Sequence, residues 1–142
     1  MSAERMLKIN FPGKLIFGNG VLDQLAQDVL AQGSRSVIVM TIKPLLATLS
    51  GFFAYLKENG VDLVVDTAIE HEPSFADFKK ILDQYGAVQA DTVIGIGGGS
   101  VLDVAKLVAA QLNNSQSLAE IVGNGLLKGR TIRLICAPTT AG

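Results

Sequence analysis

Short apolar runs alternate with helix-like segments along the whole chain. The runs fall at residues 15–17, 37–40, 63–65, 92–96 and 132–136. Between them, apolar residues recur three or four positions apart, as Leu22, Leu25 and Val29 do before Gly33, and this spacing predicts amphipathic helices. The pattern therefore predicts five strands, a helix after each of the first four, and a short helix at residues 118–122.

The second and third helices carry clear boundaries. Leu45, Leu49, Phe52 and Leu56 would form the buried face of the second, which Asn59-Gly60 ends. Ser74 is expected to cap the third helix, whose buried face would be Phe75, Phe78, Leu82 and Tyr85.

Strands that alternate with helices of this length are typical of βαβ units and a parallel sheet. The strands are continuous apolar runs, as expected when helices cover both faces of the sheet. We therefore predict one domain with an open, mostly parallel α/β sheet and helices on both faces. Ligands in such sheets bind beyond the carboxyl ends of the strands.

Composition narrows the function classes. The chain has 142 residues, 12 basic and 13 acidic side chains and a net charge of −1, which gives no reason to expect nucleic acid or a membrane as partner. Its one cysteine, Cys136, excludes an internal disulfide and is expected to be a small core residue. No apolar stretch reads as a signal or a membrane span, so we expect a soluble cytoplasmic protein.

The most informative segment is the glycine turn at residues 95–100, which joins a strand to a helix. Gly97, Gly98 and Gly99 remove every Cβ there, so the backbone can approach a ligand closely. Ser100 is expected to cap the helix, with Asp103 as its capping-box partner. Unpaired amides at the helix start would then bind a pyrophosphate, although such glycines can also serve only a tight turn.

This turn departs from the ordinary dinucleotide-binding fingerprint G-x-G-x-x-G/A. Ser100 stands at the last position, and the turn lies late in the chain instead of in the first βα unit. The sequence therefore disfavours an ordinary Rossmann dehydrogenase.

Residues 90–100, with Asp103 and Ala105-Lys106, resemble the cofactor motif of the iron-containing (group III, metal-dependent) alcohol dehydrogenase family. Residues 17–20, 73–74 and 138–142 resemble further family segments in the same order. The resemblance implies a Rossmann-like cofactor domain with these dinucleotide contacts: Gly97, Gly98, Gly99 and Ser100 around the pyrophosphate, Asp103 beside the phosphates and nicotinamide ribose, Thr139 and Thr140 on the phosphates and nicotinamide end, and Thr41 facing the adenosine ribose.

The resemblance also bears on the choice of cofactor. Family members that use NAD often place an acidic residue where the second strand ends, whereas this chain has Thr41-Ile42-Lys43. Without that carboxylate a 2′-phosphate is not repelled, and Lys43 is placed to pair with it. We therefore expect NADP(H) in preference to NAD(H), unless Lys43 is simply a solvated surface lysine.

Several parts that the family implies are not expected within residues 1–142. The metal, iron or zinc, would be held by a second, helical domain, and the single histidine, His71, offers no metal site. We expect a truncated single dinucleotide-binding domain that is inactive alone. In the full-length enzyme it would serve hydride transfer between a small alcohol or aldehyde and the nicotinamide. The helix at 101–112 is apolar nearly all round, which favours a homo-oligomer.

Two other interpretations stay open. The same cofactor domain occurs in dehydroquinate-synthase-like and glycerol-1-phosphate-dehydrogenase-like enzymes. The glycine turn would also suit a non-catalytic nucleotide-binding module.

Overall fold

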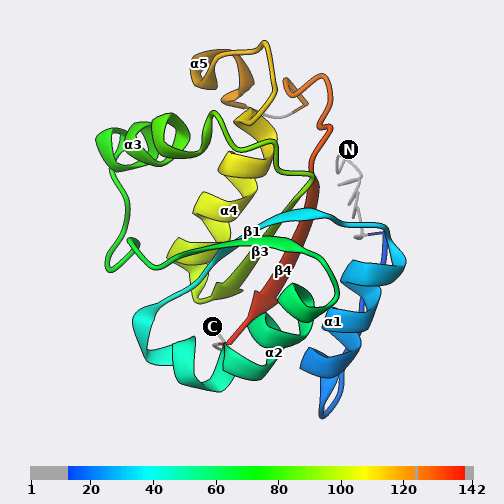
Figure 1. Ribbon diagram of the computed structural model, residues 1–142. Helices are drawn as coiled ribbons and strands as arrows, with labels where there is room; N and C mark the ends of the chain where they lie inside the picture. Colours follow the sequence, from blue (N-terminus) through cyan, green and yellow to red (C-terminus); the bar gives the residue numbers. More distant parts are fainter. Residues whose placement is uncertain (1–12, 124, 140–142) are drawn as a thin grey trace, which may run out of the picture.

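A single parallel sheet organises the computed structural model, which describes residues 13–123 and 125–139 (Figure 1). Its strands lie in the order β2-β1-β3-β4, and they span β1 Ser36–Met40, β2 Asp62–Asp66, β3 Thr92–Gly97 and β4 Arg133–Pro138. Each neighbouring pair is parallel. The predicted open, parallel α/β fold is therefore confirmed.

Helices cover both faces of this sheet (Figure 1). On one face lie α1 (Val21–Ala31) and α2 (Leu46–Glu58), and on the other lie α3 (Phe75–Tyr85) and α4 (Gly99–Gln111). A short 3₁₀ helix, η1 (Lys43–Leu45), precedes α2, and a short helix, α5 (Leu118–Ile121), follows α4. None of the helices in these described ranges is long and apolar enough to cross a membrane.

The central strands show why the sequence pattern predicted them well. Residues 37–40 of β1 and all of β3 are buried. Along β1, Ile38 and Met40 join the core under α3 and α4, while Val37 and Val39 join the core under α1 and α2. Because both faces are covered, every position of these strands is apolar or small.

The chain departs from the predicted pattern where an element lies outside these two cores. Residues 15–17 do not form a strand: Leu15 is 78% exposed and Phe17 fully exposed, and no strand of the described part pairs with them. Cys136 is exposed because β4 is an edge strand, so it is not a core residue. Phe75 begins α3 and is 76% exposed, and Ile81 fills the core in its place.

A polar cluster ties the amino-terminal edge of the sheet together. One carboxylate oxygen of Asp91 accepts hydrogen bonds from the backbone amides of Arg35 (2.7 Å) and Ser36 (3.0 Å), where β1 begins. Its other oxygen accepts one from the Thr92 hydroxyl, which also meets the Ser34 hydroxyl at 2.7 Å. Burial alone would raise the pKa of Asp91, but these hydrogen bonds hold it below its usual range. Asp91 therefore acts as a structural anchor at this edge.

Candidate functional site

The sheet has a topological switch point at its carboxyl edge, between β1 and β3, which we call the crevice. The chain leaves β1 toward β2 on one side and leaves β3 toward β4 on the other, so the loops after β1 and β3 diverge (Figure 1). Such a reversal of strand order is where open α/β sheets bind their ligands. The segments that border it begin at Thr41 and at Gly98.

The helix that starts at this crevice begins earlier than the sequence predicted. Gly98, with φ −82° and ψ −174°, occupies the N-cap position, α4 begins at Gly99, and no side chain caps it. Ser100 is thus inside the first turn, and the predicted Ser100–Asp103 capping box is wrong. Because glycine has no side chain to offer, the amides of Gly99, Ser100 and Val101 keep their hydrogen-bonding capacity. The positive end of the helix dipole faces the same place.

The glycines of the turn have two different uses. A Cβ on Gly97 would lie 3.1 Å from Cβ of Val101, so Gly97 lets the helix start close against the strand. At Gly99, in contrast, a Cβ would meet no atom within 4 Å. Tight packing therefore explains Gly97, whereas the open space at Gly99 is what a bound phosphate needs.

Thr41 supplies an independent sign of a ligand. Its amide donates to the backbone oxygen of Asp66 (2.9 Å), which joins the exits of β1 and β2. Its side chain is fully buried, yet its hydroxyl is the one buried side-chain polar atom of the described residues without a hydrogen-bond partner. The register pairs Met40 with Gly95, so Thr41 lies beside the end of β3. A buried hydroxyl without a partner costs free energy, which a ligand group or an ordered water that reaches it would offset.

The exit of β4 is held against the glycine turn. The amide of Thr139 donates to the backbone oxygen of Gly97 at 3.0 Å. Thr41, Gly97, Gly98, Gly99, Ser100 and Thr139 therefore lie along one edge of the sheet, whereas Thr140 lies outside the described residues. Asp103 is on the exposed side of α4, one turn further on, and its carboxylate lies 3.3 Å from Lys106.

Sequence reasoning missed Glu70 as a functional candidate. Its carboxylate lies 2.6 Å from Nζ of Lys43, so an ion pair bridges the loops that follow β1 and β2. The hydrogen bond and the charge of Glu70 raise the pKa of Lys43, and those of Lys43 lower the pKa of Glu70. The only sequence signal for this role of Glu70 was its place as an acidic residue shortly after the end of β2.

Asp66 was also missed, and its role is local. It accepts hydrogen bonds from the Tyr85 hydroxyl and from the Ala68 amide (2.8 Å). Both side chains are buried, and burial together with the bond to Asp66 raises the pKa of Tyr85. The pair fixes α3 to the end of β2 and so sets the course of the loop between them.

These residues fit an anionic dinucleotide better than a metal ion. The uncapped helix start, the open space at Gly99 and the unpartnered Thr41 hydroxyl suit phosphate and ribose oxygens. Within residues 13–123 and 125–139, no group of three or more His, Cys, Asp or Glu side chains could hold a metal. We therefore assign none of the described residues to a metal.

The sequence model of the iron-containing alcohol dehydrogenase family matches residues 12–142 of the chain. The chain belongs to this family. This membership favours the dehydrogenase interpretation over the dehydroquinate-synthase-like and glycerol-1-phosphate-dehydrogenase-like alternatives.

Individual relatives agree with the family assignment. The chain is 32% identical to long-chain-alcohol dehydrogenase 1 of Geobacillus thermodenitrificans, over 95% of the chain and 35% of that protein. It is 32% identical to NADH-dependent butanol dehydrogenase A of Clostridium acetobutylicum, over 71% of the chain and 26% of that protein. The solved alcohol dehydrogenase of Oenococcus oeni matches 92% of the chain and 35% of its own length, with a TM-score of 0.82 and 30% identity. The chain thus spans between about a quarter and about a third of the length of these relatives.

Proposed function

We propose that this chain binds a nicotinamide dinucleotide at the crevice between β1 and β3. It would hold the cofactor for hydride transfer to or from a small alcohol or aldehyde. The observation that carries the proposal is the uncapped start of α4 at the point where strand order reverses, next to the β1 exit, where Thr41 has a buried hydroxyl without a partner. The butanol dehydrogenase relative, whose name states NADH dependence, supports the same class of cofactor.

The family resemblance suggests the individual contacts, and Thr41, Gly97, Gly98, Gly99, Ser100 and Thr139 lie along this edge. The amides of Gly98, Gly99 and Ser100, with Gly97 giving the close approach, would bind the pyrophosphate. Thr41 would face the adenosine ribose. Thr139 and Thr140, with Asp103, would line the nicotinamide end. The cofactor supplies the hydride chemistry, and the chain binds and orients the cofactor.

We further propose that residues 1–142 act as one dinucleotide-binding domain. A divalent metal that polarises the substrate oxygen would be held by residues outside this chain. Measured alone, the chain should bind cofactor without alcohol oxidation. An apolar helix such as α4, in which Leu107 remains 37% exposed, is consistent with a homo-oligomer.

The finer preference for NADP(H) rests on the β1 exit, where no acidic residue follows Thr41. That prediction assumes that the charge of Lys43 is free, whereas Lys43 is paired with Glu70. We keep both NADP(H) and NAD(H) as cofactors of the proposed site.

A leucine at position 99 tests the proposed pyrophosphate position. Gly99 lies in the first turn of α4 with open space around it, so Gly99→Leu should leave folding intact and fill the space intended for the phosphates. Gly51→Leu is the matched control, because Gly51 is also helical, exposed and free of contacts within 4 Å.

Calorimetric titration with ADP-ribose compares the three proteins. We expect saturable binding by the unmodified protein and the Gly51 variant, and a loss of at least about tenfold in affinity for the Gly99 variant. Equal affinities in all three proteins would reject the pyrophosphate position. No binding by the unmodified protein would reject the proposed function and favour a purely structural glycine turn.

A further inference from the structure

An ion pair connects the two loops that leave the neighbouring strands β1 and β2. Nζ of Lys43 lies 2.6 Å from Oε1 of Glu70, and the two side chains are 68% and 66% exposed. Lys43 begins η1 directly after the β1 exit, two residues beyond Thr41. Both charged groups therefore stand at the carboxyl edge of the sheet and are open to a ligand bound there.

The backbone on both sides holds this pair in place. The amide of Thr41 bonds to the backbone oxygen of Asp66, and the amide of Ala68 bonds to the carboxylate of the same aspartate. Ile69, directly before Glu70, is buried in the core at 5% exposure. The backbone that leads to Glu70 is thus anchored by buried neighbours.

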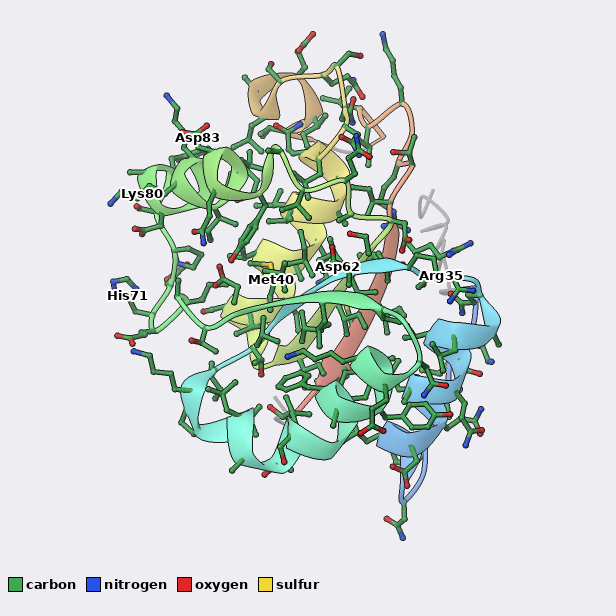
Figure 2. The ribbon with its side chains drawn as sticks, in the orientation of Figure 1. Arg35, Met40, Asp62, His71, Lys80 and Asp83 are labelled. Carbon is green, nitrogen blue, oxygen red and sulfur yellow. The ribbon has the colours of Figure 1, made fainter. Side chains whose placement is uncertain are left out.

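Stability does not account for the pair. An ion pair as exposed as this one contributes little to folding, because water screens it and both side chains lose mobility. The pKa of Glu70 is lowered by Lys43 and, to a smaller extent, by the charge of His71, so the carboxylate is ionised at neutral pH. Figure 2 shows His71 at the outer rim of this loop, pointing away from the sheet. The net effect is an ionised carboxylate that pairs with Lys43, the lysine of the β1 exit.

We infer that Glu70 is a specificity-determining residue that disfavours a 2′-phosphate on the adenosine ribose and favours the unmodified ribose hydroxyls. The inference rests on the proposed function, which puts that ribose beside Thr41. Dinucleotide sites usually select NAD with a carboxylate at the ribose and NADP with a cationic side chain there. Here both kinds of group are present, and the carboxylate of Glu70 forms an ion pair with the cationic side chain of Lys43.

Glu70 thus provides the carboxylate that the β1 exit lacks. It approaches the proposed ribose position from the loop after β2. Approach of a 2′-phosphate requires that Lys43 leave Glu70, and the phosphate then meets the charge of Glu70 directly. The sequence-based preference for NADP(H) treated Lys43 as unopposed. With Glu70 in contact, the protein should favour NAD(H).

The test compares ADP-ribose with 2′-phospho-ADP-ribose by calorimetry, on the unmodified protein, Glu70→Gln and Glu72→Gln. Glu72 is the matched control, because it is exposed on the same loop but is not the residue paired with Lys43. Glu70→Gln should raise the affinity for the 2′-phosphorylated ligand relative to ADP-ribose on the order of tenfold, the effect of one unit charge about 6 Å from a dianion in water. Glu72→Gln should change this ratio by less than about twofold, because Glu72 is not the residue paired with Lys43 and its exposed charge is screened.

The possible results separate the two proposals. A tenfold change for Glu70→Gln alone supports the inference. Binding of ADP-ribose with an unchanged ratio in Glu70→Gln, or an equal change in Glu72→Gln, overturns the inference and leaves the proposed function standing. If the unmodified protein binds neither ligand, the proposed function fails and this inference fails with it. Thermal denaturation of the three proteins should show equal stability, since both glutamates are exposed.

Discussion

Replacing Gly95 with alanine should push α4 away from β3, because the two elements meet there without room for a side chain. A Cβ on Gly95 would lie 2.8 Å from Cβ of Ala105 and 3.4 Å from Cδ2 of Leu102. Ala105 is fully buried, and its Cβ is fixed to the helix backbone, so no rotation can relieve the contact. Helix α4 must therefore move, and the backbone amides at its start, from Gly99 on, move with it.

The expected loss follows from two opposing effects. Overpacking a close-packed core costs about 1–3 kcal/mol, while alanine reduces the entropy of the unfolded chain and returns about 0.5–1 kcal/mol. Gly95→Ala should therefore lower the free energy of unfolding by about 1 kcal/mol, and by no more than about 2.5 kcal/mol. Ala105→Gly alone should cost a similar amount, from about 1 kcal/mol of helix propensity and roughly 0.8 kcal/mol for the buried carbon.

The double variant Gly95→Ala/Ala105→Gly tests whether steric contact causes the loss, because it moves one methyl group from the helix to the strand. The steric contact then disappears, so the double variant should be more stable than the summed single losses by about 1–3 kcal/mol. Urea denaturation of the four proteins, followed by circular dichroism, measures this coupling. ADP-ribose affinity should fall in Gly95→Ala and recover in the double variant. Losses that add to within about 0.5 kcal/mol would refute the reasoning.

Four further outcomes are expected from urea denaturation. Asp91→Ala should lower the free energy of unfolding by about 2–4 kcal/mol, whereas Asp91→Asn, which keeps an acceptor for both amides, should lose about 1 kcal/mol; equal losses would show that the amide bonds do not matter. Because the folded-state pKa of Asp91 is lowered, its contribution is present above the unfolded value of about 3.9 and is lost as the pH falls through the folded value. Asp91→Asn should therefore flatten the acid limb of the stability curve. Tyr85→Phe should cost about 1–3 kcal/mol at pH 7 by leaving Asp66 short of a donor. Since the pKa of Tyr85 is raised, the hydroxyl stabilises below about pH 10 and its contribution is lost at higher pH, so this variant should lose less on alkaline titration than the unmodified protein does. Phe75→Ser should change stability by less than about 0.5 kcal/mol, because the ring is mostly exposed, and a larger loss would restore Phe75 to the core.

The centre of the sheet could be predicted from sequence because its burial is two-sided. Residues 37–40 of β1 and all of β3 are buried between the two helix layers, so a continuous apolar run is a sufficient signal. At the margins the signal is ambiguous. Residues 15–17 have the composition of a strand, but pairing requires a neighbouring backbone, which the described residues do not provide. Phe75 has helical spacing, but it precedes the part of α3 that meets the core.

The candidate site was predictable only where its residues are close in sequence. The glycine turn predicts a helix start, yet the predicted start was two residues too late, because Ser100 has the residue type of a cap and Gly98 takes the N-cap position. The unpartnered hydroxyl of Thr41 and the Lys43–Glu70 pair depend on strand order and register. Neither follows from local spacing, because residues 27 positions apart come together only once β1 and β2 are neighbours.

The polar anchor at Asp91 lies at the opposite edge of the sheet from the ligand crevice. Bonds that fix β1 to β3 are thus made away from the proposed ligand crevice, and the loops after β1, β2 and β3 lie at the other end of the strands. This separation lets an ancestral scaffold acquire a new preference for one dinucleotide over another through a few loop mutations, each nearly neutral for folding.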